Sequence, residues 1–335
     1  MTINENNILK KRAAKVSLFA GIIIFITKLS AFLVTDSTAI FSDAAESIIN
    51  IVAASVALYS IIISAKPADK DHPYGHGKVE YFSAGFEGFL IALAGLVIIY
   101  SAIEKIISGT GPSQLGLGII LLGASSIANL FLSLYIKKIG EKTNSLALVA
   151  DAKHVLADVY TSFGIIVGLV VVLITDIPIL DPIIAILVAL NIFITGYKLV
   201  RESVGGLMNE VDVETLKLMS DKIISIRKPE WIDIHELRFW KSANNTFVDF
   251  HLVLPFYFTI KEAHRSDELV LAEMNKIIPG TQVKIHLDYC DFNLCKFCEF
   301  SECTKRENPI ENKSEWDQNR LIGIGIRKTN GFQEP

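Results

Sequence analysis

The stretch "DAKHVLAD" (151–158) decides the fold, because it places two aspartates, a lysine and a histidine inside a long run of apolar residues. The block around it, residues 145–175, is long enough to cross a membrane, since a spanning helix needs about 20 mostly apolar residues. Ionisable groups in hydrocarbon are costly and normally line a path for a substrate or for protons. The stretch therefore predicts a membrane helix that carries a functional site.

Five other apolar blocks are also long enough to span, so the sequence predicts a six-helix transmembrane domain over residues 1–205. The predicted spans are roughly 16–35, 39–64, 82–107, 115–137, 145–175 and 182–200. The chain is 51% hydrophobic, which is high for a soluble domain. Its first block is long enough to span, so we expect no removable signal peptide. The net charge of -4 gives no sign of a nucleic-acid partner.

Lysine and arginine gather on one side of the predicted spans. They precede the first span, follow the sixth, and occupy the loops after the second and fourth: Lys10, Lys11, Arg12, Lys15, Lys66, Lys70, Lys78, Lys137, Lys138, Lys142 and Arg201. Cytoplasmic loops carry such an excess of positive charge. We therefore expect an integral membrane protein with both termini in the cytoplasm.

After the sixth span the pattern becomes that of a small α+β domain, residues 206–288. Helical spacing alternates with strand-like segments in the order helix–strand–strand–helix–strand, at 211–226, 234–240, 246–255, 262–278 and 282–288. The remaining residues, 289–335, form a polar tail with no clear periodicity.

The second span repeats the skeleton of the opening octapeptide. In "DAAESIIN" (43–50) Glu46 and Asn50 stand four residues apart, as His154 and Asp158 do in the fifth span. Residues at i and i+4 share one helical face, so two such helices can present four N and O ligands to one point. This donor set suits a divalent metal. The alternative is that these are isolated polar groups at helix contacts, which for Asn50 alone would be the better interpretation.

Three other charged residues of the spans have open roles. Asp43 and Asp151 precede the two ligand pairs by nearly one turn, so each could support a ligand, end a helix in water or carry protons. Lys28, in the first span, more simply pairs with a carboxylate or extends to the interface.

The loop after the second span reads "DKDHPYGHGKVE" (69–80). Asp69, His72 and His76 supply a carboxylate and two imidazoles, which is a plausible metal trio. The alternative is a polar turn made by Pro73, Gly75 and Gly77 with solvated histidines.

The soluble domain holds four more histidines, three of them on predicted strands. One alone would better be interpreted as structural, but all four lie within about 50 residues, together with an aspartate at i+2 of the last. This density favours a metal cluster of His235, His251, His264, His286 and Asp288.

All four cysteines lie in the tail, as Cys290, Cys295, Cys298 and Cys303. A cytoplasmic setting argues against structural disulfides. Four thiolates can hold a tetrahedral zinc, although the C-x4-C-x2-C-x4-C spacing is not that of a standard zinc ribbon or finger. The alternative is four reduced thiols on a mobile tail.

Taken together, the spans, the paired ligands, the loop "DHPYGHGKVE" (71–80) and the α+β domain resemble the cation diffusion facilitators, and most closely their bacterial zinc and iron efflux branch. The resemblance implies a homodimer in a bacterial or archaeal inner or plasma membrane, which exchanges Zn2+ or a related divalent cation for protons. It also implies that the histidine cluster bridges two protomers, that its domain is metallochaperone-like, and that Lys78 joins a charge network at the dimer. The branch usually has two aspartates where this chain has Glu46 and Asn50, so Fe2+, Co2+, Mn2+ or Cd2+ remain candidate substrates.

Two other classes of protein, a membrane metalloenzyme and a metal sensor or scaffold, are alternatives to a transporter. A membrane metalloenzyme would need an activated water and a catalytic partner such as the Glu of an H-E-x-x-H helix, and no such partner is evident. A sensor or scaffold that binds metal without moving it would also fit Asn50 and the cysteine tail. We expect a proton-coupled exporter rather than an enzyme.

Overall fold

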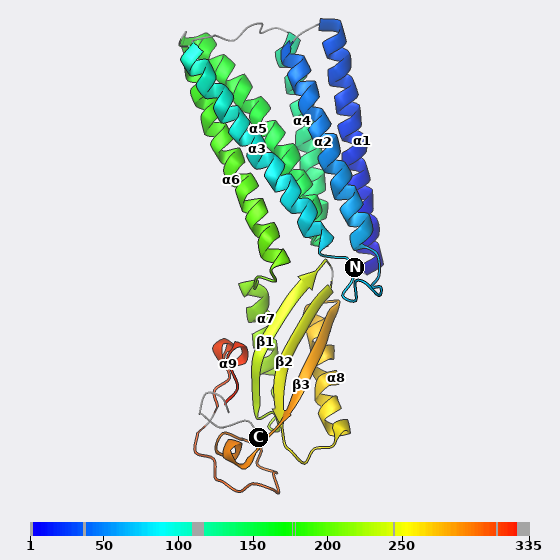
Figure 1. Ribbon diagram of the computed structural model, residues 1–335, viewed down its shortest axis with the longest axis vertical. Coiled ribbons are helices and arrows are strands. Elements are labelled where there is room, and N and C mark those ends of the chain that lie inside the picture. Colours follow the sequence, from blue (N-terminus) through cyan, green and yellow to red (C-terminus); the bar gives the residue numbers. More distant parts are fainter. Residues whose placement is uncertain are drawn as a thin grey trace. The chain divides into compact units, whose positions relative to one another are not determined.

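The computed structural model describes residues 3–35, 38–108, 117–175, 177, 179–243, 245–312 and 314–326 (Figure 1). The chain divides into two compact units, Met1–Met208 and Asn209–Pro335.

The first unit consists of long helices, as hydropathy predicts. They are α1 (Ile3–Thr35), α2 (Thr38–Ser64), α3 (Val79–Ser108), α4 (Leu117–Thr143), α5 (Leu146–Thr175) and α6 (Leu180–Leu207). Each predicted span lies on one of them, and α1 begins 13 residues before its span because the polar segment with Lys10 and Lys15 is also helical. Four of the helices contain a described stretch long and apolar enough to cross a membrane. The predicted fold class, a helical membrane domain before an α+β domain, is confirmed.

Helices α3 and α6 lie side by side in the first unit (Figure 1). Glycine permits this close approach. A Cβ atom at Gly196 on α6 would lie 2.5 Å from the backbone nitrogen of Ala92, and one at Gly88 on α3 would lie 2.9 Å from that of Val200. Small residues at helix contacts let backbones pack closely in membranes, where van der Waals contact drives association.

A buried ion pair with its hydrogen bonds connects α1, α2, α3 and the start of α5 near the α2–α3 loop. The Lys10 ammonium of α1 lies 3.0 Å from Oε1 of Glu80 on α3, and the two residues are 1% and 3% exposed. Glu80 also accepts hydrogen bonds from Ser64 at the end of α2 (2.9 Å) and from Ser145 before α5 (2.5 Å). This network fixes four chain segments around one carboxylate, and hydropathy alone did not predict it.

The second unit has the predicted order of elements: α7 (Val213–Ser225), β1 (Asp233–Ser242), β2 (Asn245–Leu254), α8 (Ile260–Ile277) and β3 (Thr281–Tyr289). Strand β2 is central, antiparallel to β1 and parallel to β3. The helices pack on one face of the sheet, where Met219 of α7 and Val270 of α8 join Phe250 and Leu252 of β2 in the core. Strand residues alternate between faces, so His251 of β2 points to the opposite side.

The polar tail folds onto this sheet. It contains a short 3-10 helix, η1 (Phe292–Lys296), and one helical turn, α9 (Gln318–Ile322). Leu321 of α9 and Trp316 before it are buried in the same core as α7 and α8. Tail and predicted domain thus form one compact unit, because apolar residues too sparse to give a periodicity still reach the core.

Candidate metal sites

The intramembrane site lies where α2 and α5 meet. His154 Nε2 is 2.9 Å from the amide oxygen of Asn50, and the amide nitrogen of Asn50 donates to Oδ2 of Asp158. The i and i+4 spacing on α5 therefore puts His154 and Asp158 on the face that meets Asn50. The side chain of Glu46, the fourth predicted ligand, and that of Asp43 lie outside the described residues.

The hydrogen bonds indicate one tautomer of His154. Because the Asn50 nitrogen donates to Asp158, its oxygen faces His154, so His154 Nε2 carries the proton in this assignment. The amide thereby gives the Asp158 carboxylate a polar partner. For Nε2 to bind a metal, a neutral His154 would have to carry its proton on Nδ1 instead, and the amide would have to turn so that its oxygen becomes a ligand.

Two more buried carboxylates lie in the bundle. Asp151 on α5 is 1% exposed and Glu87 on α3 is fully buried, and both Glu87 oxygens lack a hydrogen-bond partner among the described residues. The sequence left the role of Asp151 open, and Glu87 was not predicted to be part of a buried polar group. The signal was present, because Glu87 is a charged residue inside an apolar span.

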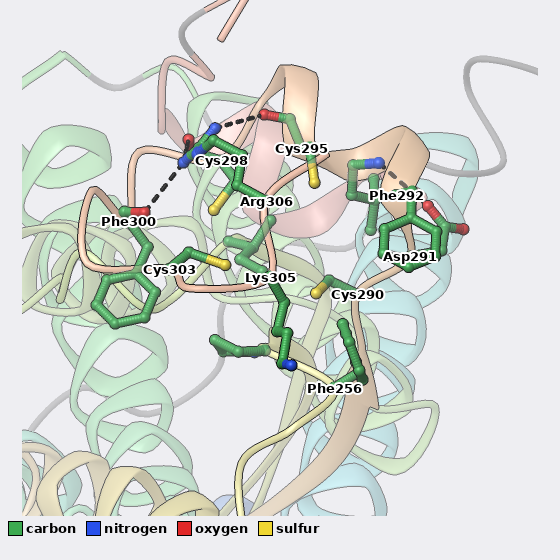
Figure 2. A pocket seen from close by; sticks show the side chains of 13 residues that line it. Phe256, Cys290, Asp291, Phe292, Cys295, Cys298, Phe300, Cys303, Lys305 and Arg306 are labelled. Atoms are coloured by element: carbon green, nitrogen blue, oxygen red, sulfur yellow. Dashed lines mark hydrogen bonds between the residues drawn. The ribbon is translucent and has the colours of Figure 1, made fainter. Parts of the chain in front are cut away.

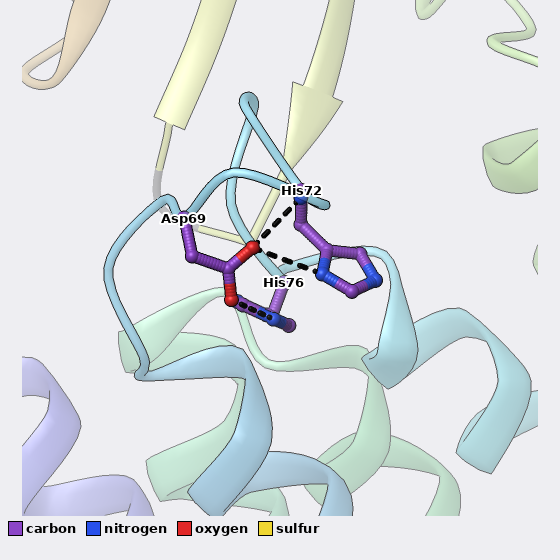
Figure 3. Close-up of side chains that lie close together, drawn as sticks. All are labelled: Asp69, His72 and His76. Atoms are coloured by element: carbon purple, nitrogen blue, oxygen red, sulfur yellow. Dashed lines mark hydrogen bonds and ion pairs between the residues drawn. The ribbon is translucent and has the colours of Figure 1, made fainter.

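The loop between α2 and α3 brings Asp69, His72 and His76 together (Figure 3). Asp69 Oδ1 lies 3.2 Å from His72 Nδ1, Asp69 Oδ2 lies 3.3 Å from His76 Nε2, and one ligand atom from each residue lies within 4.8 Å of the others. The backbone N–H of His72 donates to Asp69, and this hydrogen bond is the main cause of the lowered pKa of that carboxyl. The trio can thus present an ionised carboxylate and two imidazoles to one cation.

The turn itself also follows from the sequence. Gly75 adopts φ +80°, a conformation that glycine tolerates and other residues rarely adopt. His72 and His76 are thereby folded back toward each other, with ring centroids 4.3 Å apart. The same turn therefore brings the three potential ligands together, so a polar turn and a metal trio are compatible interpretations of this loop.

Three histidines form a row across the sheet of the second unit. The strand register pairs His235 of β1 with His251 of β2, and His251 with His286 of β3. The ring centroids are 4.9 Å apart for the first pair and 4.6 Å for the second. Strand pairing alone therefore lines up residues that are far apart in the sequence.

Asp288 completes this row, because on β3 it shares a face with His286. Its carboxylate lies 3.0 Å from His251 Nδ1, 3.7 Å from His235 Nε2 and 3.4 Å from His286 Nε2. One ligand atom each from His235, His251 and Asp288 lies within 4.8 Å of the other two. We call His235, His251, His286 and Asp288 the histidine row.

The tail supports one end of the histidine row. Arg320 donates through Nε (2.9 Å) and Nη2 to the carboxylate of Asp233, which also accepts from the backbone N–H of Ile326 at 3.1 Å. Asp233 Oδ2 lies 3.2 Å from His235 Nδ1, on the side of the ring away from Asp288. The contact places a negative charge beside the ring, although His235 Nδ1 has no hydrogen-bond partner among the described residues.

His264 does not join the row within one chain. It lies on α8, which covers the other face of the sheet, and its ring is within 3.6 Å of Asp267 and of Glu268 on the same helix. Lys78, predicted to act at a dimer, donates to the backbone oxygen of Leu207 at the end of α6, at 3.3 Å.

The tail cysteines line one pocket beside β3. Burial raises the pKa of Cys290 and of Cys298, which favours the protonated thiol at neutral pH.

These features define an integral membrane protein of the metal cation efflux class, with clustered polar side chains inside a helix bundle and clustered histidines on the sheet of the second unit. The cation efflux transmembrane domain matches residues 14–208, and the cytoplasmic domain of cation efflux proteins matches residues 212–290. The chain belongs to the cation diffusion facilitator family, whose members transport divalent metal cations.

Three relatives illustrate this membership. The uncharacterized transporter sll1263 of Synechocystis is 34% identical over 78% of this chain and 84% of its own length. The manganese efflux system protein MneP of Bacillus subtilis is 30% identical over 78% of this chain and 89% of its own. The cation-efflux pump FieF of Shewanella oneidensis is 25% identical over 83% and 93%, respectively.

Proposed function

We propose that this protein exports a divalent metal from the cytoplasm in exchange for protons, with Zn2+ as the first candidate. The observation that carries the proposal is the contact of Asn50 with His154 and Asp158 between two membrane helices. Buried hydrogen-bonding groups of this kind have no partner in lipid, so they mark an internal path.

The coupling follows from the protons that these ligands hold. A metal arriving from the cytoplasm takes the Nε2 lone pair of His154 and the carboxylate of Asp158, with Glu46 as a further ligand, and it displaces the protons that these groups hold when His154 is an imidazolium or a carboxyl is protonated. On the outer side, a higher proton concentration returns a proton to His154 and releases the metal. Histidine suits this role because its ordinary pKa lies near physiological pH.

The identity of the metal depends on the donor set. Imidazole suits Zn2+ and Fe2+, whereas carboxylate and amide oxygens suit Mn2+. The histidines here and in the histidine row favour Zn2+, while the similarity to MneP, a manganese efflux protein by name, makes Mn2+ the competitor to test. Fe2+, Co2+ and Cd2+ are the other metals of the panel to be tested for transport.

We further propose that two chains form a homodimer through the second unit, with a metal at the histidine row; we call this unit (Asn209–Pro335) the cytoplasmic unit after the domain family that it matches. His264 then serves the row of a second protomer, since α8 places it on the far face of its own sheet. The loop trio Asp69, His72 and His76 would bind a cytoplasmic metal near the entrance, Lys78 would contribute to the dimer, and both termini would be cytoplasmic.

The test is metal flux in sealed vesicles with a proton gradient. His154→Ala and Asp158→Ala should each abolish gradient-driven uptake into inside-out vesicles, because each removes one proposed ligand of the transported metal. Thr195→Ala is the control: it removes a hydroxyl of α6 whose hydrogen bond among the described residues goes to its own helix, at 2.9 Å from the carbonyl of Asn191, and it should transport normally.

Normal flux by both site variants would refute the assigned site. Metal binding by the native chain without flux in any panel metal would instead favour the sensor or scaffold. Flux that persists at equal rate after the proton gradient is collapsed would remove the antiport mechanism but keep the metal path.

A further inference from the structure

The four cysteines of the tail converge on one place although they come from different segments. Cys290 directly follows β3, Cys295 lies in η1, and Cys298 and Cys303 lie in the turns beyond it. All four line the same pocket, and Figure 2 shows their sulfur atoms directed into it from different sides. Chance placement of thiols on an irregular segment would not produce this convergence.

The backbone around the pocket is held independently of the sulfur atoms. The guanidinium of Arg306 donates to the carbonyl oxygens of Cys295 (3.0 Å), Cys298 (2.9 Å) and Phe300 (3.0 Å), as Figure 2 shows. The N–H of Cys290 donates to the carbonyl of Leu254 on β2 at 2.9 Å. The sulfur atoms are thus presented by a fixed main chain, and the four thiols are free of disulfides.

The geometry points to a further metal site: we propose that Cys290, Cys295, Cys298 and Cys303 bind one zinc-class ion through four thiolates. Four sulfur ligands in a tetrahedral arrangement are the signature of Zn2+, and Cd2+ or Co2+ can replace it. Four thiolates and one divalent ion carry a net charge of two minus, which Lys305 and Arg306, both lining the pocket, offset.

Metal binding must draw the sulfur atoms together. Among the described residues, the sets with three ligand atoms within 4.8 Å of one another are the loop trio and part of the histidine row, so the sulfurs stand farther apart. A zinc–sulfur bond is about 2.3 Å long, so the bound sulfurs of a tetrahedron lie roughly 3.8 Å apart. Because Arg306 holds the main chain, we expect the sulfur atoms to approach one another mainly by rotation of the cysteine side chains about χ1.

The site has a structural role in the tail. Beyond η1 this segment has little regular structure, and small folds of this kind depend on a metal or on disulfides because their apolar core is small. Cys298 packs with Ile232, Val253 and Ile326, and the N–H of Ile326 donates to Asp233 behind His235. An ion at the cysteines therefore also fixes the part of the tail that supports the histidine row.

The test uses the full-length protein in detergent, reduced and loaded with Co2+. A tetrathiolate site gives intense sulfur-to-cobalt charge-transfer absorption in the near ultraviolet, which imidazole and carboxylate sites do not give. We expect this band in the native chain, its loss in Cys295→Ser/Cys303→Ser, and its retention in His251→Ala/His286→Ala. The last variant separates this site from the proposed transporter sites, and Ser301→Ala is the matched control within the same loop.

A second measurement on the native chain covers the case in which the cysteine variant fails to fold. Zn2+ should protect all four thiols from alkylation, counted by mass spectrometry, and removal of the metal by a chelator should restore their reactivity. Absence of the charge-transfer band, with all four thiols equally reactive with and without Zn2+, would overturn the proposal. Disulfides formed in preference to metal binding under mild oxidation, with no cobalt–thiolate band after reduction, would overturn it too and indicate a redox pair instead.

Discussion

The membrane unit and the cytoplasmic unit hold their polar clusters in opposite ways. In the membrane unit Asn50, His154 and Asp158 satisfy one another across a helix contact, and Glu80 does the same for Lys10. In the cytoplasmic unit the histidine row is placed by strand register and shares a single carboxylate among three rings. These buried groups are paired within the protein, although both oxygens of Glu87 and Nδ1 of His154 have no hydrogen-bond partner among the described residues, whereas groups on a sheet face can be paired by an ion.

This difference predicts whether a mutation lowers the stability of the fold itself or only the additional stability that a bound metal would provide. Removing one member of a buried set leaves a partner uncompensated in a low-dielectric interior, which is costly. Removing one member of the histidine row leaves the apo fold almost unchanged and removes the gain that metal binding would add. A site that must release its cargo benefits from the first arrangement, because the protein itself supplies a partner when the metal leaves.

The largest effect is expected at the buried ion pair. Glu80→Gln removes the charge that compensates Lys10, whose ammonium is then buried without an ionic partner, so we expect a loss of about 3–5 kcal/mol of stability. The midpoint of thermal unfolding of the full chain in detergent measures it. Adding Lys10→Met should recover much of the loss, since replacing a whole buried pair by apolar groups is often neutral.

An exposed pair of the same unit is the control. Lys137 and Glu141 lie 3.8 Å apart on α4 with more than half of each side chain exposed, so Glu141→Gln should change stability by less than about 1 kcal/mol. Equal effects of Glu80→Gln and Glu141→Gln would contradict the argument that burial decides the cost.

The second prediction concerns the histidine row. At free Zn2+ of 100 to 1,000 times the dissociation constant, binding to the folded state alone adds about 2.7–4.1 kcal/mol. In a Cys295→Ser/Cys303→Ser background, which removes the proposed cysteine site, His251→Ala/His286→Ala should abolish this zinc-dependent rise in the unfolding temperature of the cytoplasmic unit, and it should lower the dimer fraction in zinc. Lys284→Ala, on the same strand and face as His286, should respond like the native chain. A double variant that gained as much from zinc as the native chain would refute the row as a metal site.

The sequence predicted the helices and the α5 site because both rest on local periodicity. Apolar length gives each span, and the i, i+4 rule gives His154 and Asp158. The sequence also showed that the row contains imidazole and carboxylate groups. Which of these residues are neighbours across β1, β2 and β3 depends on the strand register, which the sequence does not give. His264 could not be separated from the other histidines, since only packing shows that α8 covers the opposite face.

The sequence failed where contacts are long-range and lack periodicity. The four groups around Glu80 come from positions 10, 64, 80 and 145, and no spacing rule links them. Glu87 was overlooked inside a strongly apolar span, although its charge alone was a signal. The packing of the tail depends on a few residues such as Trp316 and Leu321, which are too sparse to show a pattern.

The third prediction tests how the membrane site balances its charge. In Asn50→Asp the donor to Asp158 is replaced by a second carboxylate, and two close carboxylates share a proton until a cation arrives. Each Zn2+ bound should therefore release more protons than in the native site, most clearly near neutral pH. Calorimetry in buffers of different ionisation enthalpy counts the protons, and a His251→Ala/His286→Ala/Cys295→Ser/Cys303→Ser background removes the signals of the row and of the proposed cysteine site. An unchanged proton count with binding intact would place Asn50 outside the metal's ligands.

The smallest effect is expected at an exposed cap of the cytoplasmic unit. Asp212 begins α7: its carboxylate accepts from the N–H groups of Glu214 (3.2 Å) and Thr215 (3.3 Å), and from the Lys241 ammonium at 2.7 Å. Partial burial works to raise the pKa of Asp212, but the hydrogen bonds from Lys241 and Thr215 outweigh it and lower the pKa to about 2. The ionised carboxylate is therefore the form that stabilises the helix.

Asp212→Ala should cost about 1 kcal/mol, the usual value of a lost N-cap, while Asp212→Asn should cost less because an amide oxygen also caps. Since the folded pKa lies below the ordinary value of 3.8, the contribution of Asp212 is complete above that value and is lost as pH falls toward 2. Denaturant unfolding of the cytoplasmic unit between pH 2 and 6 measures this, and the alanine variant should lose stability less steeply on acidification than the native chain. Parallel pH profiles would show that the carboxylate is not ionically engaged in the folded protein, and that this exposed cluster contributes only the cap.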